Sequence, residues 1–168
     1  AVTPLIDFVN LMTYDLVNGY ATVTGHHTPL HDYLPGQEST SKCVNWLINK
    51  KVPAKKLIIG AAMYARVWEN VPNNNNGLYQ DGKFKQGLSY SLFTKFFSDT
   101  AGFKYYWDSD AKAPYYYSAT KKLFATFDDK RSIQEKTGYI RNKKLGGIMF
   151  WELPDDLKKD GLVDEMSR

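Results

Sequence analysis

The stretch Phe8-Val-Asn-Leu-Met-Thr-Tyr-Asp15 decides the fold of this chain. Its apolar run begins at Ile6 and ends at Met12, which predicts a buried strand. The run is followed by an aromatic residue and an acid, Tyr14 and Asp15. Because functional side chains are often placed on the segments that follow rigid elements, this strand end is a candidate ligand site.

Two later stretches of the sequence have the same form. Residues 56–64 are apolar and end in Tyr64, with Arg66 two residues further on, and residues 145–152 end in Trp151-Glu152. Both stretches predict buried strands. In a (β/α)₈ barrel the ligand lies at the carboxyl ends of the strands, so three similar strand ends indicate one pocket. In the alternative, these aromatic and charged residues stand at the strand ends only because such positions are exposed to solvent, and they form no pocket.

A helix is predicted between the first two strands. The stretch Ser39-Thr-Ser41 offers N-cap hydroxyls, Val44, Leu47 and Ile48 give the helix an apolar face, and Pro53 follows its end. The order strand, helix, strand predicts a parallel sheet. The outer strands of a three-stranded sheet each leave an edge unpaired, so we expect further chain upstream or a second copy to cover these edges.

The middle of the chain departs from this pattern and predicts a small α+β insertion. Leu88 to Phe97 has the spacing of a short amphipathic helix. Three further stretches alternate like antiparallel strands: Phe103 to Asp108, Ala113 to Tyr117 and Lys122 to Phe127.

The parallel pattern then resumes with a helix from Asp128 to Asn142 and the strand ending at Trp151, and the tail from Asp156 to Arg168 predicts one short helix that carries Leu162, Val163 and Met166. The predicted fold class is therefore α/β with an inserted α+β unit. The predicted boundaries are 1–68 for two strands and their helix, 69–127 for the insertion, and 128–168 for the last helices and strand.

Composition excludes several kinds of protein. The net charge is +4, but Lys and Arg are scattered among acids, which disfavours a nucleic-acid partner. No apolar run approaches the ~18 residues that span a bilayer, so no membrane segment is predicted.

Cys43 is the single cysteine, which rules out an internal disulfide, and its apolar helical setting predicts a buried structural thiol. The aromatic share of 15% fits either a Tyr-rich core or a surface that stacks on flat ligands.

Four motifs resemble, in order, those of glycoside hydrolase family 18, the chitinases. Met12-Thr-Tyr-Asp15 resembles the sixth-strand motif of the barrel, and Thr24 to Leu30 resembles the loop that follows it. Leu57 to Arg66 resembles strand seven, and Gly146 to Glu152 resembles strand eight. The resemblance implies a partial TIM (β/α)₈ barrel, about strands six to eight.

Residues 69–127 resemble the family's insertion domain. Its landmarks are kept at Trp107-Asp108, Ala113 to Tyr115 and Phe127 to Asp129. The sequence departs from the family pattern at Ala62, Ala65 and Phe127, where Pro, Gly and Tyr are usual. These departures concern the shape of the pocket more than family membership.

The resemblance implies a retaining, substrate-assisted hydrolysis of β-1,4-linked N-acetylglucosamine polymers, that is, chitin or chito-oligosaccharides. Tyr14 would donate a hydrogen bond to the acetamido oxygen of the substrate. Asp15 would accept one from an acetamido or hydroxyl group, and Trp151 would form the floor under the sugar. The alternatives are rim packing for Tyr14 and a loop cap for Asp15.

Five further residues are implied at the sugar site. Met12 and Met149 would flank Trp151, although Met more often fills a core. Tyr64 and Arg66 would line the pocket, with Arg66 as a structural ion-pair partner in the alternative. Tyr20 lies where the family often has an aromatic residue for the next sugar.

The family's fourth-strand signature, Asp-x-x-Asp-x-Asp-x-Glu, which contains the general acid, does not occur in these 168 residues. We therefore expect strands one to five to precede Ala1, and we expect this chain alone to be inactive. No cofactor or metal is expected, because His26, His27 and His31 follow no zinc-ligand spacing.

The alternatives to a chitinase are a chitin-binding chitinase-like lectin, an endo-β-N-acetylglucosaminidase of the same family, and an assembly fragment. The substrate class implies an extracellular location.

Overall fold

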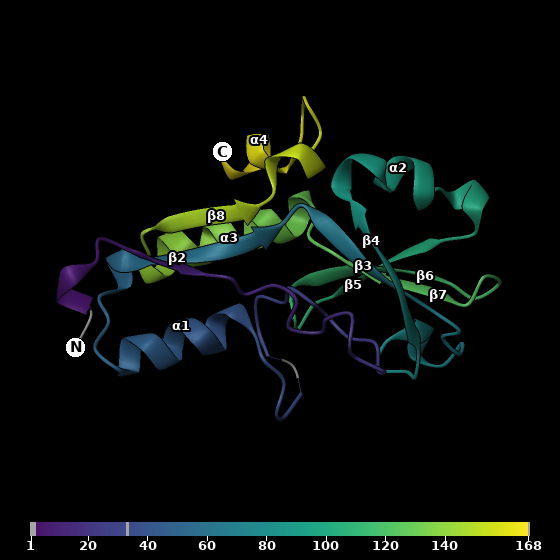
Figure 1. Ribbon diagram of the computed structural model, residues 1–168, viewed down its shortest axis with the longest axis horizontal. Helices are drawn as coiled ribbons and strands as arrows, with labels where there is room; N and C mark the ends of the chain where they lie inside the picture. The colour runs from purple at the N-terminus through teal and green to yellow at the C-terminus, as the bar shows by residue number, and fades with distance from the viewer. Residues whose placement is uncertain (1–2, 33, 168) are drawn as a thin grey trace.

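The computed structural model describes residues 3–32 and 34–167 (Figure 1). Its named strands are β1 (Val9–Leu11), β2 (Leu57–Ala62), β3 (Tyr64–Glu69), β4 (Lys83–Ser89), β5 (Lys104–Asp108), β6 (Ala113–Ser118), β7 (Leu123–Thr126) and β8 (Gly147–Trp151). Its α-helices are α1 (Thr40–Asn49), α2 (Phe93–Phe96), α3 (Lys130–Lys143) and α4 (Leu162–Met166). Short 3₁₀ helices span Thr3–Leu5, Ala54–Lys56, Asn75–Gly77, Tyr90–Leu92, Asp99–Ala101 and Leu153–Asp155.

The first sheet is parallel and has the strand order β1-β2-β8. Leu11 pairs with Ile59, and Ile59 pairs in turn with Ile148, so the three apolar runs form one sheet as predicted. Leu57 and Ile59 are fully buried, together with Val44 from α1. These side chains form one apolar cluster with residues of α3, so the sheet and both helices share a core.

Side-chain caps fix where the two long helices begin. Ser39 is the N-cap of α1, and its hydroxyl accepts a hydrogen bond from the backbone N–H of Lys42 at 3.1 Å. Asp129 and Ser132 form a reciprocal capping box at the start of α3. The predicted helix from Asp128 therefore begins two residues later, at Lys130.

The second sheet is antiparallel and has the order β4-β3-β7-β6-β5. The three strands predicted near residues 103, 113 and 122 are confirmed as β5, β6 and β7. Alternate residues of β6 belong to different cores: Tyr116 packs against the Phe-rich cluster on one face, while Tyr115 and Tyr117 belong to the Trp68 cluster. The sheet thus has apolar side chains on both faces.

The run predicted as one strand over residues 56–64 is two strands in the structure. β2 ends at Ala62, and Tyr64 begins β3, which pairs with β4 and β7 in the other sheet. The backbone of Met63 bridges the two sheets, since its N–H donates to the carbonyl of Trp151 and its carbonyl accepts from the N–H of Tyr90, both at 2.8 Å. An apolar run carries no sign of such a change of pairing partner.

Two predicted helices were wrong in extent. In the stretch from Leu88, Leu88 and Ser89 finish β4, and the helix begins two residues later than predicted, as a 3₁₀ turn over Tyr90–Leu92 that continues into α2 over Phe93–Phe96. The tail forms a helix only over Leu162–Met166, because the carboxylate of Asp156 accepts hydrogen bonds from the N–H groups of Leu162 and Val163 and thereby fixes a loop before it. Arg168, at the end of the predicted tail helix, lies outside the described residues.

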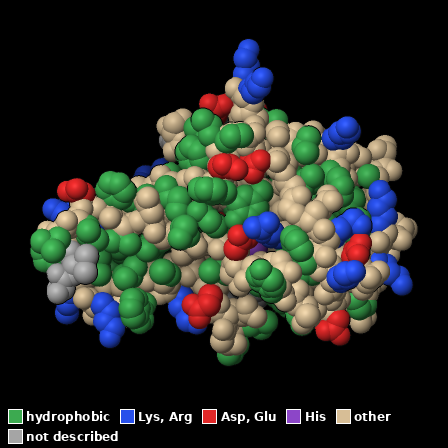
Figure 2. Space-filling model, viewed as in Figure 1, with side chains coloured by type: hydrophobic (Ala, Val, Ile, Leu, Met, Phe, Trp, Pro, Cys, Tyr) green, Lys and Arg blue, Asp and Glu red, His purple; other side chains and the backbone are tan. Residues whose placement is uncertain are grey.

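Figure 2 shows Lys and Arg side chains scattered over the face in view and mixed with acids, without one continuous basic patch. None of the described helices combines the length and apolar character that crossing a bilayer requires.

Candidate functional site

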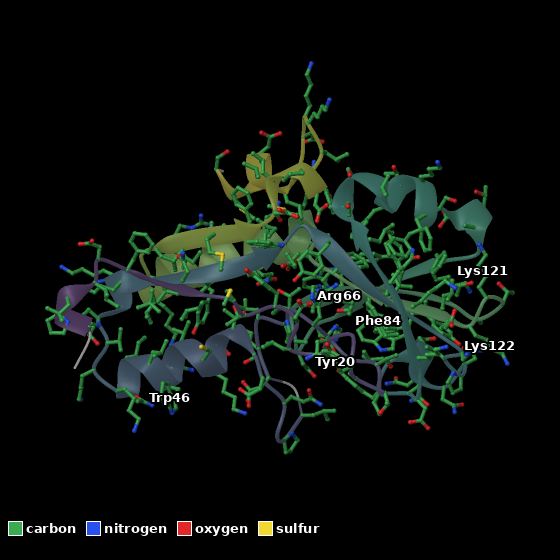
Figure 3. The ribbon with its side chains drawn as sticks, in the orientation of Figure 1. Tyr20, Trp46, Arg66, Phe84, Lys121 and Lys122 are labelled. Atoms are coloured by element: carbon green, nitrogen blue, oxygen red, sulfur yellow. The ribbon has the colours of Figure 1, made fainter. Side chains whose placement is uncertain are left out.

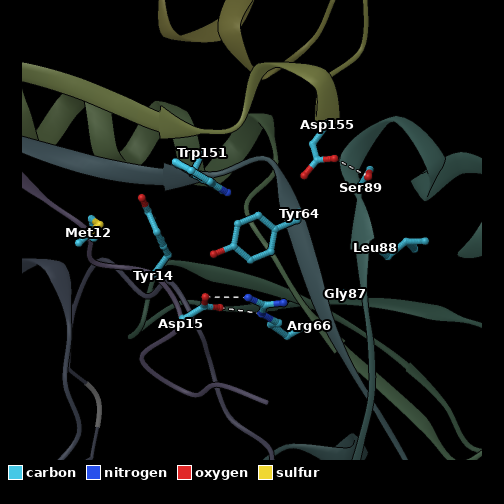
Figure 4. Close-up of a pocket in the computed structure, with 10 residues that line it drawn as sticks. All are labelled: Met12, Tyr14, Asp15, Tyr64, Arg66, Gly87, Leu88, Ser89, Trp151 and Asp155. Atoms are coloured by element: carbon cyan, nitrogen blue, oxygen red, sulfur yellow. Dashed lines mark hydrogen bonds and ion pairs between the residues drawn. The ribbon is translucent and has the colours of Figure 1, made fainter. Parts of the chain in front are cut away.

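A pocket of about 410 Å³ lies where the carboxyl ends of β1 and β8 meet the start of β3 and the end of β4 (Figure 4). Its lining combines aromatic rings, a methionine, two carboxylates and one guanidinium. The lining residues are Met12, Tyr14, Asp15, Tyr64, Arg66, Gly87, Leu88, Ser89, Trp151 and Asp155. The same edge of the parallel sheet therefore presents the polar groups of two strands that are far apart in sequence.

Asp15 is held in the pocket wall by two neighbours. Arg66 donates from Nε to Oδ1 and from Nη2 to Oδ2, each at 2.7 Å, which makes a bidentate pair. On the other side, Nδ1 of the buried His27 lies 3.4 Å from the backbone nitrogen of Asp15, which donates to it, and 3.6 Å from Oδ1. Asp15 adopts a left-handed backbone, with φ of 57°. Such a conformation at a non-glycine residue persists only where the surroundings fix it, and it is common at functional sites.

These contacts control the charge of Asp15. Burial on its own raises the pKa of this carboxyl, but the hydrogen bonds and charges of His27 and Arg66 outweigh it and hold the pKa well below its usual range. Asp15 is therefore ionised at neutral pH and acts as a fixed hydrogen-bond acceptor.

Tyr14 and Tyr64 stand edge to face in the pocket, with ring centroids 6.2 Å apart. Burial and the nearby charge of Asp15 raise the pKa of both phenols, so each hydroxyl stays protonated and is able to donate a hydrogen bond. The guanidinium of Arg66 stacks on the Tyr64 ring, 4.6 Å from its centroid. The Tyr64 ring also contacts His27, at 5.4 Å between centroids.

Trp151 supplies a broad apolar surface to the pocket. It ends β8, opposite Ala62 of β2, and 56% of it is exposed. Met12 is also largely exposed. An indole of this size that faces a pocket offers a flat contact surface for an apolar ring face.

Six of the eight residues singled out in the sequence line this pocket: Met12, Tyr14, Asp15, Tyr64, Arg66 and Trp151. Met149 is not part of the lining, and its sulfur accepts a hydrogen bond from the Tyr14 hydroxyl at 4.0 Å. Tyr20 is not part of the lining. Its side chain is 96% exposed on the loop after β1 (Figure 3).

Sequence reasoning missed Ser89 and Asp155. Ser89 comes from the antiparallel sheet, to which the rule about parallel strand ends does not apply. Asp155 follows β8 by four residues, and the acid nearest to that strand, Glu152, is exposed and does not line the pocket. The acidic character of the segment after Trp151 was the available signal.

A buried polar cluster lies behind the site. Nζ of Lys136, on α3, donates at 2.6 Å to both Asp128 and the Thr28 hydroxyl, and both charged side chains are inaccessible to solvent. Asp128 also accepts a hydrogen bond from the backbone N–H of Ala62 at 3.0 Å. The cluster therefore ties α3 to the loop beside His27 and to the end of β2.

The histidines of the first loop have structural surroundings. His26 is buried, with Nε2 3.1 Å from Asp108, whose pKa is lowered to about 2: burial raises it, but the bond to His26 and the backbone N–H of Ala111 outweigh that effect. His31 packs against Tyr139 at 5.8 Å. Within the described residues, no three His, Cys, Asp or Glu side chains are grouped as metal ligands.

The chain has an α/β fold, and aromatic rings and carboxylates gather at the carboxyl edge of its parallel sheet. In proteins of this class, small ligands bind at that edge. The family model of glycosyl hydrolases family 18 matches residues 1–156. The chain belongs to glycoside hydrolase family 18.

Two curated relatives are chitinases. Chitinase A1 of Niallia circulans is 32% identical over 94% of this chain and 25% of its own length. Chitinase B of Serratia marcescens is 26% identical over 99% of this chain and 44% of its own length. The chain therefore spans less than half the length of these relatives.

Solved structures have the same fold. A family 18 N-acetylglucosaminidase from Paenibacillus barengoltzii superposes with a TM-score of 0.89 at 38% identity, covering 98% of this chain and 49% of that one. The chitinase ChiW from Paenibacillus sp. str. FPU-7 superposes with a TM-score of 0.91 at 35% identity, covering 98% of this chain and 20% of that one. The family 18 α/β fold is thus common to all of them.

Proposed function

We propose that this chain is the C-terminal part of the catalytic domain of a chitinase, which hydrolyses β-1,4-linked N-acetylglucosamine polymers with retention of configuration. One observation carries the proposal. Tyr14, Asp15 and Trp151, which the family resemblance assigns to the acetamide and the sugar ring, line one pocket together with Tyr64 and Arg66.

In this proposal the parallel sheet β1-β2-β8 forms strands six to eight of a (β/α)₈ barrel, and the five-stranded sheet is the inserted domain. The pairing of β3 with β4 and β7 favours a boundary at Met63 in place of residue 68. The inserted part then runs to residue 127, and α3, β8 and α4 complete the barrel part.

The proposed chemistry uses the substrate's own acetamido group as nucleophile. Its carbonyl oxygen attacks the anomeric carbon, and the bond to the leaving sugar breaks as a general acid protonates the leaving oxygen. The Tyr14 hydroxyl donates to the acetamide and holds it in line, which removes orientational entropy from the barrier. Asp15, kept ionised by Arg66 and His27, accepts a hydrogen bond from the acetamide N–H or from a sugar hydroxyl and so fixes the sugar in the same orientation.

Trp151 supports the sugar from below. A pyranose presents its C–H groups on one face, and the exposed indole offers a matching apolar plane. Met12 extends this surface at the pocket rim. Met149 accepts the single proton of the Tyr14 hydroxyl at 4.0 Å, and this proton turns to the acetamide oxygen when the sugar binds, so Met149 acts through Tyr14.

The general acid is the missing part, since residues of the fourth-strand signature do not occur in this sequence. We propose that a preceding barrel segment supplies it. Incubating the purified chain with a fluorogenic chitobioside tests this proposal. We expect no turnover above background, and turnover that survives purification to homogeneity would contradict it.

Two other functions known for this family are the alternatives: a different glycosidase activity and sugar binding without hydrolysis. An endo-β-N-acetylglucosaminidase that acts on glycoproteins is the second candidate, and the P. barengoltzii relative is itself an N-acetylglucosaminidase. A chitinase-like lectin with the same pocket and no acid is the third. A Glu at the end of an upstream fourth-strand signature supports an enzyme, whereas Leu or Gln there supports a lectin.

Two further proposals follow from the same assignment. The outer edges of β1 and β8 would be covered by the rest of the barrel, or else by a second copy of the chain, which light scattering at several concentrations distinguishes. An extracellular location is proposed because polymeric chitin does not enter cells.

A further inference from the structure

The pocket contains two carboxylates, Asp15 and Asp155, and only Asp15 is paired with a cationic side chain of the described residues. Asp15 is neutralised by the bidentate Arg66 and flanked by His27. Asp155 has no Lys, Arg or His within ion-pair distance among the residues that the structure describes. Because Asp15 and Arg66 cancel, the Asp155 carboxylate gives the pocket lining an uncompensated negative charge.

Asp155 is held in a defined orientation at the pocket wall. The Ser89 hydroxyl donates to Oδ1 at 2.6 Å, and the backbone N–H of Asp155 donates to the carbonyl of Glu152 at 3.0 Å. No donor from the described part of the chain reaches Oδ2. One carboxylate oxygen is therefore fixed by the protein, and the other is left for a ligand.

The position of Asp155 separates it from the acetamide site. Figure 4 shows Tyr14 and Asp155 on opposite sides of the pocket, with Trp151 and Tyr64 between them. A ligand group that contacts Asp155 is thus distinct from the group that Tyr14 and Asp15 hold.

We propose that Asp155 binds the ammonium group of a glucosamine unit, so that the site prefers partly deacetylated chitin over fully acetylated chitin. This inference rests on the proposed function. A chain of β-1,4-linked N-acetylglucosamine is neutral, and loss of an acetyl group leaves a primary amine at C2, which is protonated in neutral water. That ammonium is the cation such a polymer can offer to an unpaired carboxylate.

Asp15 and Asp155 would then bind different sugar units of the same chain. The unit that is cleaved keeps its acetamide, because the acetamide is the nucleophile, and this unit occupies the Tyr14 side. The glucosamine unit occupies a neighbouring position and places its ammonium at Oδ2 of Asp155. The balanced Asp15–Arg66 pair gives no electrostatic advantage to a cation, so the preference arises at Asp155.

Calorimetric titration of the chain tests this proposal. The ligands are fully acetylated chitotetraose and the four tetramers that each carry one glucosamine at a different position. We expect one of the four to bind about three- to fivefold more tightly than the acetylated tetramer, as for a partly exposed ion pair, and we expect the preference to decrease with added salt.

The variant Asp155→Asn keeps the size of the side chain and an acceptor for Ser89, and it should abolish the preference, so that all five tetramers bind it with equal affinity. Glu38→Gln removes an exposed carboxylate that is paired with Lys42 and does not line the pocket, and it should leave the preference intact. Thermal melts of both variants control for folding.

Equal affinity for all five ligands, or a preference that survives in Asp155→Asn, would overturn the inference while the proposed function stands. If none of the five tetramers binds, the proposed function fails, and the inference fails with it.

Discussion

The guanidinium of Arg66 is paired with the carboxylate of Asp15 through two parallel hydrogen bonds of 2.7 Å each. The two residues are 51 positions apart in sequence and come from different sheets, since Asp15 follows β1 and Arg66 lies on β3. This pair joins the parallel sheet to the antiparallel sheet across the pocket. It explains how Asp15 stays charged in a half-buried position.

Replacing Arg66 by Lys should raise the pKa of Asp15, because an ammonium cannot match both carboxylate oxygens. We expect affinity for chitotetraose to fall about tenfold, since the acceptor loses its fixed orientation. An NMR pH titration of the Asp15 carboxyl carbon measures the first effect, and calorimetry the second. An unchanged Asp15 pKa in the variant would show that Arg66 does not control its charge.

Tyr14→Phe removes the proposed donor to the acetamide. In the complete catalytic domain, kcat should fall about 100-fold, as when one preorganised donor is lost, with a smaller change in KM. Steady-state kinetics with a chito-oligosaccharide measures both. Tyr106→Phe, on β5 and outside the pocket lining, is the matched control. A rise in KM with kcat unchanged would contradict this prediction, because it would mean that Tyr14 contributes to ground-state binding only.

Lys136→Met should lower the free energy of unfolding by about 3–5 kcal/mol, because it leaves the buried Asp128 carboxylate without its partner. Lys130→Met, in the same helix, breaks the partly exposed pair with Asp160 and should cost less than about 1 kcal/mol. Urea unfolding of the two variants gives the comparison. Equal losses would contradict the structural role given to the buried pair.

Acid should destabilise the chain in two steps. Burial lowers the pKa of His26 and of His27, so the unfolded state binds protons first as pH falls through about 6.5, and stability declines from there. The lowered pKa of Asp15 stabilises the fold above the unfolded value of about 4, and this contribution is lost only as pH falls further, through the folded pKa. Unfolding free energies between pH 7 and 5 should therefore depend less on pH in His27→Gln, and an unchanged slope would contradict this assignment.

The parts of the fold that local pattern controls were predictable. The runs that became β1, β2 and β8 are apolar and pair in one sheet, which is the part that their pattern predicts. The predicted burial holds for β2 but not for β1 and β8, whose residues are mostly half-buried or exposed. Hydroxyls at Ser39 and an acid at Asp129 mark helix starts, because a helix must satisfy its first N–H groups.

The parts that depend on distant partners were not predictable. The break at Met63 depends on backbone bonds to Trp151 and Tyr90, and β4 forms because β3 lies beside it. Lys136 reads as a polar position in a helix, yet it is fully buried, because Asp128 and Thr28 meet it from two other segments. Asp155 and Ser89 reach the pocket for the same reason, through contacts that join the two sheets.

The indole N–H signals of the chain give the most direct test of the central claim that Trp151 and the Tyr14–Asp15 strand end form a sugar site. The chain has four tryptophans. Trp68 is buried, and Trp46 is 59% exposed on α1, away from the pocket, so it serves as an internal control for unspecific contact (Figure 3). In a ¹H–¹⁵N NMR titration with chitotetraose, we predict that the Trp151 indole signal shifts and saturates while that of Trp46 does not move. A Trp151 signal that stays in place at saturating ligand, or equal shifts at Trp46 and Trp151, would contradict the account.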